Sequence, residues 1–312
     1  MTTATAISVS GLTKSFGSKV AVNNLDMEIR KGEIYGFLGP NGSGKTTSIR
    51  MLCGLLRPDS GQGTCLGYDI LSEAHRIKPH VGYMTQRFSL YEDMTVRENL
   101  EFTARVFGLK NGTGIVRDCM DRMRLGQFEN QLAGNLSGGW KQRLSLGVCT
   151  LHKPALLLLD EPTAGVDPGA RRAFWDEVHA LASEGITALI STHYMDEAER
   201  CHRLAYIAYG NLLASGTVES MIRDAGLTTW SVARYADADT SLHALSLSLK
   251  NKPGVDQVVA FGNTLHVSGR DAARLAQSIE PYRSVPFVWN EIDTSLEEVF
   301  IDMMQQTGGK QS

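Results

Sequence analysis

The chain has 312 residues, of which 42% are hydrophobic and 21% charged, as is usual for a globular protein with one or two domains. Its net charge of −3 gives no electrostatic reason to expect a nucleic-acid partner or an anionic membrane surface. The five cysteines lack the spacing of a zinc site, and no apolar run approaches the roughly 20 residues of a membrane-spanning helix. We therefore expect a cytosolic chain with reduced thiols, whose role at a membrane would depend on a partner chain.

The first part of the chain alternates strand-like and helix-like segments, which predicts an α/β domain with a largely parallel sheet. Apolar residues at helical spacing predict helices over 96–107 and 170–181. Continuous apolar sequence indicates that the strands over 155–159 and 187–191 are buried. Strands are also predicted over 7–9, 25–29 and 33–38.

The pattern changes near Ser215-Gly216-Thr217, where Thr217 is placed to cap a short helix that Asp224-Ala225-Gly226 ends. The segments that follow have the order strand, helix, strand, strand, helix, strand, which is typical of a small ferredoxin-like domain. Leucines in the second of them suit either a helix or a strand. These segments cover residues 230–233, 242–249, 255–261, 264–267, 272–279 and 285–289.

A final helix is predicted over 296–304, with an apolar stripe that we interpret as core packing. The residues before it, Thr294-x-x-Glu297, have the pattern of a capping box. We therefore divide the chain into a first domain of residues 1–225 and a small α+β accessory domain of residues 226–312.

A glycine-rich segment after the predicted strand 33–38 matches G-x-x-x-x-G-K-[ST] without mismatch. Its glycines let backbone N–H groups point at phosphate oxygens, and the N-terminus of the next helix adds a favourable dipole. Lys45 is placed to neutralise the β- and γ-phosphates, Thr46 to bind Mg²⁺ and Thr47 to reach the α-phosphate. The predicted contacts to ATP come from Gly39, Pro40, Asn41, Gly42, Ser43, Gly44, Lys45, Thr46 and Thr47.

Two acidic residues stand at the end of the predicted buried strand 155–159. Asp160 is placed to hold Mg²⁺ through water, because this ion keeps much of its hydration shell. Glu161 lies one residue further along, where a carboxylate can polarise the water that attacks the γ-phosphate. We predict that Asp160 is a metal residue and Glu161 the general base.

The segment Leu136-Ser137-Gly138-Gly139-Trp140 precedes this acidic pair, and together with the phosphate loop it resembles the signature of the ATP-binding cassette (ABC) family. The resemblance covers roughly the first 225 residues, with the motifs in family order. It implies a P-loop NTPase cassette with a RecA-like core, an antiparallel β subdomain and a helical subdomain. It also implies that Ser137, Gly138 and Gly139 complete the ATP site of a second cassette.

The same resemblance implies roles for residues elsewhere in the chain. Gln86 resembles the Q-loop glutamine that contacts Mg²⁺ and the lytic water, and His193 resembles the switch histidine that contacts the γ-phosphate. The segment Ala164-Gly165-Val166-Asp167 resembles the D-loop, and Phe16 stands where the family stacks an aromatic ring on adenine. Trp140 departs from the family pattern, which has glutamine there, and it is free to pack on ribose or at the dimer interface.

The amino-acid sequence of the C-terminal segment Thr294–Ile301 is similar to that of drug-resistance (daunorubicin-resistance-like) ABC exporters. This implies an ATP-hydrolysing subunit on the cytoplasmic side of a membrane, held there by an integral membrane permease. The groove for that permease is expected at Phe88, Leu90 and Tyr91. A second cassette is the other expected partner, as a homodimer, and no nucleic acid is expected.

Two alternative functions share the cassette. One is a non-transport ABC ATPase that acts on ribosomes or DNA, and the other is the ATPase of an importer. A ribosomal member would usually contain two cassettes, and a DNA-repair member would need long heptad segments that this sequence lacks. The exporter interpretation is therefore favoured.

Overall fold

The computed structural model describes residues 4–235 and 241–308. The chain divides into two compact units, Met1–Ser215 and Gly216–Ser312. This boundary lies upstream of the predicted one, because helix α8 (Val218–Ala225) belongs to the second unit. Among the helices that the structure describes, none combines the length and the apolar character needed to cross a membrane.

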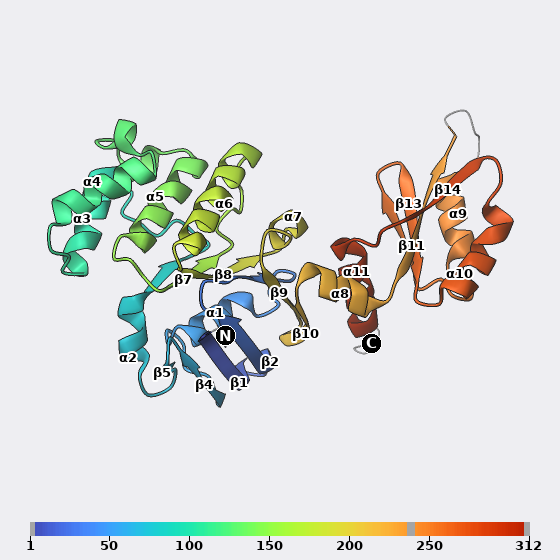
Figure 1. Cartoon of the computed structure of the whole chain (residues 1–312), viewed down its shortest axis with the longest axis horizontal. Coiled ribbons are helices and arrows are strands. Elements are labelled where there is room, and N and C mark those ends of the chain that lie inside the picture. Colours follow the sequence, from blue (N-terminus) through green and yellow to red (C-terminus); the bar gives the residue numbers. More distant parts are fainter. Residues whose placement is uncertain (1–3, 236–240, 309–312) are drawn as a thin grey trace. The chain divides into compact units, whose positions relative to one another are not determined.

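The first unit is built on a six-stranded sheet with the spatial order β10-β9-β3-β8-β7-β6 (Figure 1). The five strands β6, β7, β8, β3 and β9 pair with one another in parallel. Every residue of β7 and β8 is buried, as their continuous apolar sequence predicts. The strands are β3 (Ile34–Leu38), β6 (Val81–Met84), β7 (Leu156–Asp160), β8 (Thr187–Thr192), β9 (Arg203–Ala208) and β10 (Asn211–Gly216).

A second sheet of the same unit is antiparallel, with the order β2-β1-β4-β5. Helix α1 (Lys45–Leu52) lies between the two sheets in Figure 1 and buries Ile49, Met51 and Leu52 in a core shared with both. This packing fixes the start of α1 at the end of β3, where the phosphate loop is. The strands are β1 (Thr5–Phe16), β2 (Lys19–Arg30), β4 (Ser60–Cys65) and β5 (Tyr68–Asp69).

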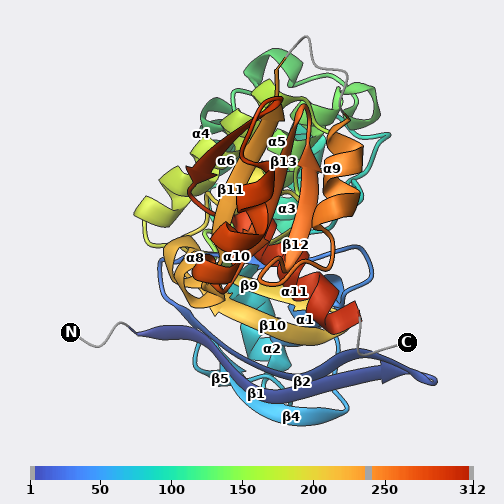
Figure 2. The same ribbon diagram turned by 90° about the vertical axis from the view of Figure 1, so that its right-hand side faces the viewer.

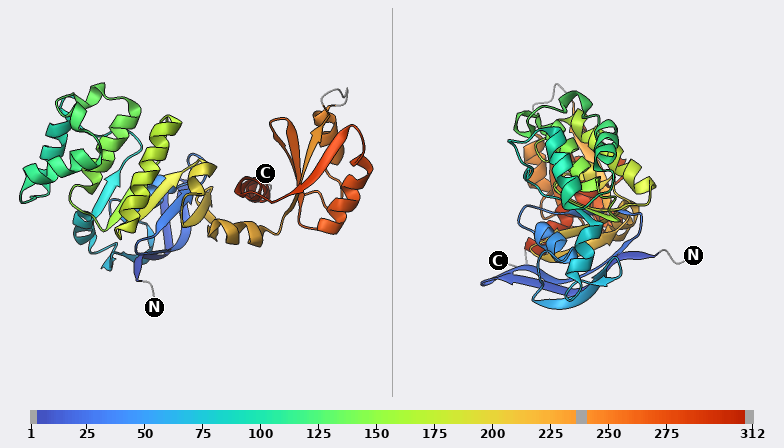
Figure 3. Two further views of the ribbon diagram at one scale, coloured as in Figure 1. Left: turned by 45° about the horizontal axis from the view of Figure 1, so that its top comes forward. Right: turned by 90° about the vertical axis from the view of Figure 1, so that its left-hand side faces the viewer.

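Helices make up the rest of the first unit, and α3 packs against α4 and α5 (green in Figure 3). Thr95 and Glu98 form a capping box at the start of α3, which explains where this helix begins. Asp167 caps α6 by accepting hydrogen bonds from the backbone N–H groups of Gly169 and Ala170. The helices are α2 (Ala74–Ile77), α3 (Val96–Val106), α4 (Gly112–Arg122), α5 (Gly138–Thr150), α6 (Pro168–Ser183) and α7 (Met195–Ala198).

The second unit contains a four-stranded antiparallel sheet with the order β12-β13-β11-β14. Helices α9 and α10 lie on one face of this sheet (Figure 2), and leucines of both helices belong to the core of the unit. The ambiguous segment 242–249 is therefore a helix. Helix α11 lies on the other face (Figure 3). The elements are α8, β11 (Thr228–Arg234), α9 (Leu242–Leu249), β12 (Gln257–Phe261), β13 (Thr264–Gly269), α10 (Ala272–Ile279), β14 (Phe287–Ile292) and α11 (Leu296–Gly308).

The capping box predicted at Thr294 is wrong by one residue. The carboxylate of Glu298 accepts hydrogen bonds from the backbone N–H and the hydroxyl of Ser295, so these two residues close the turn before α11. Thr294 instead donates to the carbonyl of Leu227 at 2.9 Å and contacts the Thr229 hydroxyl at 2.8 Å. The tertiary contact to β11 therefore decides which hydroxyl is available to the helix.

Candidate nucleotide site

The phosphate loop joins β3 to α1 through backbone conformations that side chains rarely adopt. Gly42 and Gly44 have φ angles of 76° and 107°. A Cβ atom on Gly44 would lie 2.4 Å from the carbonyl oxygen of Ala21, and one on Gly39 would lie 2.0 Å from that of Ile207. The sequence pattern of the loop thus follows from the close approach of two neighbouring segments.

Lys45, the first residue of α1, has a side chain that is only 4% exposed. Its ammonium donates to the carbonyl oxygens of Gly39 and Pro40 at 2.8 and 3.1 Å. Burial lowers the pKa of Lys45, while the nearby carboxylate of Glu161 opposes this change. The buried hydroxyl of Ser43 has no hydrogen-bond partner within the described residues. A buried ammonium and an unsatisfied donor fit a polyanionic ligand at the N-terminus of α1.

Asp160, the last residue of β7, is 2% exposed and accepts hydrogen bonds from two hydroxyl groups. Thr46 donates to its Oδ1 at 3.0 Å, and Ser191 donates to the same oxygen at 2.6 Å. Mg²⁺ prefers oxygen ligands and keeps several waters, so one hydroxyl and one carboxylate beside a phosphate site suit this ion. The oxygen atoms of Thr46 and Asp160 therefore fit the predicted Mg²⁺. This ion needs no further carboxylate from the protein, because it keeps several waters.

Glu161 is the point at which three residues predicted from separate motifs meet. Its Oε1 lies 3.3 Å from the Lys45 ammonium, its Oε2 accepts from the Gln86 amide at 2.9 Å, and Nδ1 of His193 lies 3.4 Å from Oε2. The backbone of Glu161 has a φ of 47°, which costs about 1–3 kcal/mol in a residue other than glycine. Its N–H is held by the Ser191 hydroxyl at 2.9 Å.

A cavity of about 450 Å³ opens in front of these groups. Phe16 stands in its lining with 53% of its surface exposed, as expected of a ring that is free to stack on a flat ligand. All lining residues except Lys19 and Ala21 belong to the predicted site. The lining consists of Phe16, Lys19, Ala21, Asn41, Gly42, Gly44, Lys45, Thr46, Thr47, Gln86 and Glu161.

The predicted signature residues Ser137, Gly138 and Gly139 do not line this cavity, as far as the described residues go. Ser137 is exposed at the N-terminus of α5, and its hydroxyl makes no capping bond within the described part of the chain. A Cβ on Gly139 would lie 2.6 Å from the Cβ of Ala170, whereas one on Gly138 would have the carbonyl oxygen of Gly165 at 4.0 Å, an ordinary van der Waals contact. The first glycine is thus free to face a partner, and the second allows α5 to approach α6.

Comparison with known proteins identifies the chain. A family description, "ABC transporter", matches residues 22–164. The Nod factor export ATP-binding protein I of Ralstonia nicotianae is 36% identical over 303 residues, which cover 95% of this chain and 92% of that protein. The chain belongs to the ABC transporter family. Cassettes of this family bind and hydrolyse ATP, and the predicted fold class is confirmed for the cassette.

Other similar proteins match about 70% of the chain. The probable multidrug ABC transporter ATP-binding protein YbhF of Escherichia coli K12 is 42% identical over 221 residues, which cover 70% of this chain and only 38% of that protein. The daunorubicin resistance ATP-binding protein DrrA3 of Streptomyces coeruleorubidus is 36% identical over 225 residues, or 71% of this chain and 71% of that one. The ADP-bound structure of the ABC cassette MJ1267 superimposes with a TM-score of 0.63 and 27% identity, covering 72% of this chain and 95% of that one.

Trp140 of the ABC signature packs within its own chain. Its ring centroid lies 4.5 Å from that of Phe128, and the guanidinium of Arg143 lies 5.3 Å from the Trp140 ring. The ring remains partly exposed. Trp140 therefore contacts two residues of its own chain and keeps part of its surface exposed.

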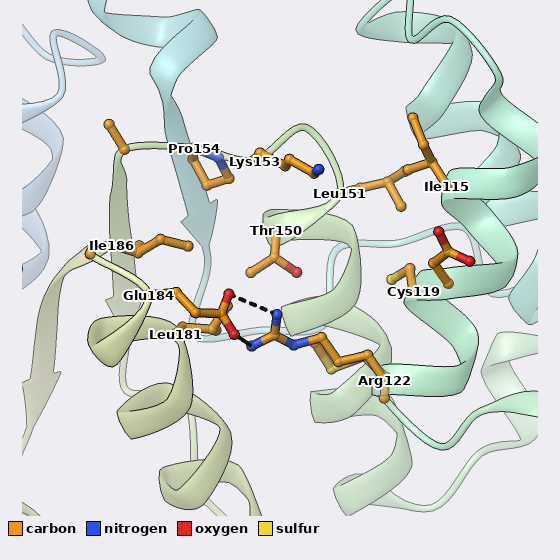
Figure 4. Close-up of a pocket in the computed structure, with 14 residues that line it drawn as sticks. Ile115, Cys119, Arg122, Thr150, Leu151, Lys153, Pro154, Leu181, Glu184 and Ile186 are labelled. Atoms are coloured by element: carbon orange, nitrogen blue, oxygen red, sulfur yellow. Dashed lines mark hydrogen bonds and ion pairs between the residues drawn. The ribbon is translucent and has the colours of Figure 1, made fainter.

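A larger cavity of the cassette, about 590 Å³, lies between α4, the end of α5 and the end of α6 (Figure 4). Arg122 projects into it and pairs with Glu184 at 2.9 Å and with Glu177. Because two carboxylates already neutralise this guanidinium, it is poorly suited to bind phosphate. The cavity also contains none of the phosphate-loop residues. We therefore assign the candidate nucleotide site to the smaller cavity.

Sequence reasoning missed several residues around this ABC site. Ser191 joins Asp160 to the backbone of Glu161, and Glu197 contacts the hydroxyls of Thr163 and Thr192. One signal was available, because Ser191 and Thr192 are polar residues at the carboxyl end of a buried parallel strand, where ligands of α/β proteins bind.

Proposed function

We propose that the chain is the ATP-binding and ATP-hydrolysing subunit of an ABC exporter. The observation that carries this proposal is the convergence of Lys45, Gln86 and His193 on the carboxylate of Glu161, beside the phosphate loop. The relatives support the direction of transport, since their names are those of multidrug, Nod factor and daunorubicin-resistance ATP-binding proteins.

Glu161 acts as the general base of ATP hydrolysis in this proposal. It accepts a proton from water as the water oxygen bonds to the γ-phosphorus and the bond from that phosphorus to the β–γ bridging oxygen breaks, which releases ADP and phosphate. His193 contacts the γ-phosphate. Gln86 would contact the attacking water and Mg²⁺, and its amide donates to Glu161 in the structure. Bound Mg²⁺ would be held by Thr46 and, through water, by Asp160, and it supplies charge neutralisation of the phosphates.

Lys45 changes partner when ATP binds. In the structure its ammonium forms an ion pair with Glu161 at 3.3 Å and donates hydrogen bonds to two loop carbonyls. The β- and γ-phosphates of ATP offer stronger and more numerous acceptors at the same place. Binding thus draws Lys45 away from Glu161 and leaves this carboxylate free to accept a proton. Phe16 receives the adenine, and the backbone of the phosphate loop holds the phosphates.

The second partner of the site is another cassette, and we propose a homodimer. Ser137, Gly138 and Gly139 stand at the N-terminus of α5, outside the cavity of their own chain, where backbone N–H groups can meet the γ-phosphate of the opposite cassette. The segment ending in Asp167 lies beside them, since Gly139 is close to Ala170 at the start of α6.

The permease is proposed to dock next to Gln86. The ring of Tyr91 is 52% exposed and meets Phe102 edge-on at 5.2 Å, and the Lys141 ammonium lies over the ring of Phe88 at 5.1 Å. Exposed aromatic rings of this kind are typical of an interface. The chain would then be peripheral to the membrane, on its cytoplasmic side. We propose that the second compact unit, Gly216–Ser312, which includes the predicted residues 226–312, is an accessory domain of the ATP-binding subunit.

The Glu161→Gln variant tests the base and the dimer together. We expect it to bind ATP and to hydrolyse it about 100-fold or more slowly, because the proton acceptor is lost while the phosphate contacts remain. It should accumulate as an ATP-bound dimer, measured by light scattering after size exclusion. Lys45→Ala, which lacks the phosphate contact, is the matched control that stays monomeric. Hydrolysis at the parental rate in Glu161→Gln would show that another group is the base.

The permease surface is tested by Tyr91→Glu. Because the ring is half exposed, the charge should leave folding and the ATP hydrolysis of the isolated chain unchanged, while burying it in an apolar interface is costly. We expect the tagged variant to lose copurification of an integral membrane protein from detergent-solubilised membranes. Retained copurification would contradict this surface, and parental chain found with ribosomes instead of a permease would contradict transport.

A further inference from the structure

We propose that Glu197 is a positioning residue for ATP hydrolysis, which sets the places of both Glu161 and His193. The proposal rests on the roles of those two residues in the proposed function. Glu197 lies on α7, and its side chain is 1% exposed. This carboxylate has no direct role at the ATP site. A buried carboxylate is costly unless several hydrogen-bond donors surround it.

Glu197 holds the loop that carries Glu161. Its Oε1 accepts a hydrogen bond from the hydroxyl of Thr163, two residues after Glu161. This loop needs holding, because Glu161 has a φ of 47° and such a conformation persists only where the surroundings impose it. Ser191 fixes the residue at its N–H, and Glu197 fixes the chain just beyond it.

Glu197 also holds the chain on both sides of His193. Its Oε2 accepts from the hydroxyl of Thr192 at 2.6 Å, and that same hydroxyl accepts from the backbone N–H of Tyr194 at 3.0 Å. His193 lies between these two residues. Its ring therefore reaches Glu161 from a backbone that one carboxylate has fixed.

A third contact extends the cluster to α6. The Nε atom of Arg171 lies 3.4 Å from Oε1 of Glu197, and the same guanidinium lies 4.4 Å from the ring of Tyr194. Helix α6 begins directly after Asp167, in the segment that resembles the D-loop. One buried carboxylate thus joins three segments: the loop of Glu161, the loop of His193 and the start of α6.

The geometry predicts that loss of Glu197 lowers kcat without changing nucleotide affinity. Glu197 touches neither the phosphate loop nor the described lining of the ATP cavity, so its loss should leave nucleotide affinity intact. It should lower kcat, because the base and the histidine lose their places, and a displacement of about 1 Å can cost roughly 100-fold in rate. Glu197→Gln keeps the shape but removes the charge, and its amide leaves one of the two hydroxyls without an acceptor.

The test is a double-mutant cycle of the full chain. We expect Glu197→Gln to lower kcat by roughly 10- to 100-fold with KM for ATP within about twofold. In a His193→Ala background the same substitution should lower kcat by a smaller factor than it does in the parent, because one of the two residues through which it acts is already gone. Thr163→Val, which removes one donor and keeps the fold, should lower kcat in the same way. Glu199→Gln, at an exposed site two residues along, is the matched control.

Several outcomes would overturn the proposal. A parental kcat in Glu197→Gln, a rise in KM without a fall in kcat, or fully additive losses with His193→Ala would each show that Glu197 does not act through these groups. If Glu197→Gln fails to fold, a parental kcat in Thr163→Val overturns it equally. Parental rates in both His193→Ala and Glu161→Gln would instead overturn the proposed function, and the role of Glu197 with it.

Discussion

Around the ATP site, close contacts between single atoms restrict which residue a position can hold, in addition to the sequence motifs. Gly139 is an example, because its place in the signature is set by packing as well as by any contact to a partner. The hydrogen atom of its α-carbon faces the Cβ of Ala170, and a methyl group there would stand 2.6 Å from that atom. Gly138, its neighbour, has no such restriction. Close packing therefore explains the glycine at position 139 of the motif, but it does not explain the glycine at position 138.

We expect Gly139→Ala to destabilise the chain by about 1–3 kcal/mol, because α5 and α6 must move apart to admit the methyl group. Gly138→Ala should cost less, since the nearest atom to its Cβ would be the carbonyl oxygen of Gly165 at 4.0 Å. Adding Ala170→Gly to Gly139→Ala should restore most of the loss. Urea unfolding of the parent and these three variants measures this, and no recovery in the double variant would contradict the packing explanation.

The sequence was sufficient for the phosphate loop and the acidic pair, and insufficient for Ser191 and Glu197. Lys45, Asp160 and Glu161 are recognisable because each belongs to a short contiguous pattern next to a predicted strand. Ser191 and Glu197 act on residues that are distant in the sequence, and a serine or a glutamate in isolation carries no such pattern. Only the pairing of β7 with β8 brings Ser191 to Asp160.

At the scale of elements, helix α11 shows how tertiary contacts select a local motif. Glu298, 1% exposed, accepts from Ser295 at the start of the helix and contacts His266 of β13 at 2.6 Å. Burial opposes its ionisation, yet these hydrogen bonds hold the pKa of Glu298 below its usual value. Because Thr229 and Leu227 take the Thr294 hydroxyl, the box forms one residue later than the sequence predicts.

A depressed pKa of Glu298 implies stability that is present above the unfolded pKa of about 4.3 and is lost as the pH falls through the folded pKa. We expect Glu298→Gln to destabilise the chain by about 1.5–3 kcal/mol at pH 7, as for hydrogen bonds to a charged group. The difference from the parent should shrink as the pH falls below about 4. Glu297→Gln, at an exposed position of the same turn, is the control, and a difference independent of pH would contradict the assignment.

At the scale of the whole molecule, the order of the parallel strands assembles the site. Strands β3, β8 and β7 are neighbours, so the segments that follow them emerge at one edge of the sheet. These segments carry the phosphate loop, His193 and Glu161. Residues more than a hundred positions apart in the sequence, such as Lys45 and Glu161, therefore meet at this edge.

ATP with Mg²⁺ should stabilise the folded chain, because the unfolded chain has no such edge. At a concentration 100 times the Kd, we expect the free energy of unfolding to rise by about 2.7 kcal/mol in Glu161→Gln, which does not consume the nucleotide. Lys45→Ala should abolish the rise. Thermal unfolding with and without nucleotide measures both, and a rise that survives Lys45→Ala would place the ATP elsewhere.

The sequence by itself determined the family, the phosphate loop and the acidic pair, because these depend on local patterns: glycines where φ must be positive, and acids at the end of an apolar strand. It also fixed most helices and strands through their periodicity. Only the tertiary structure decided that Glu161 is held by Lys45, Gln86 and His193, that Gly139 meets Ala170, and that Ser295 rather than Thr294 joins the box with Glu298. These contacts depend on which strands and helices become neighbours in space. Such neighbours have no regular spacing in the sequence from which the contact could be predicted.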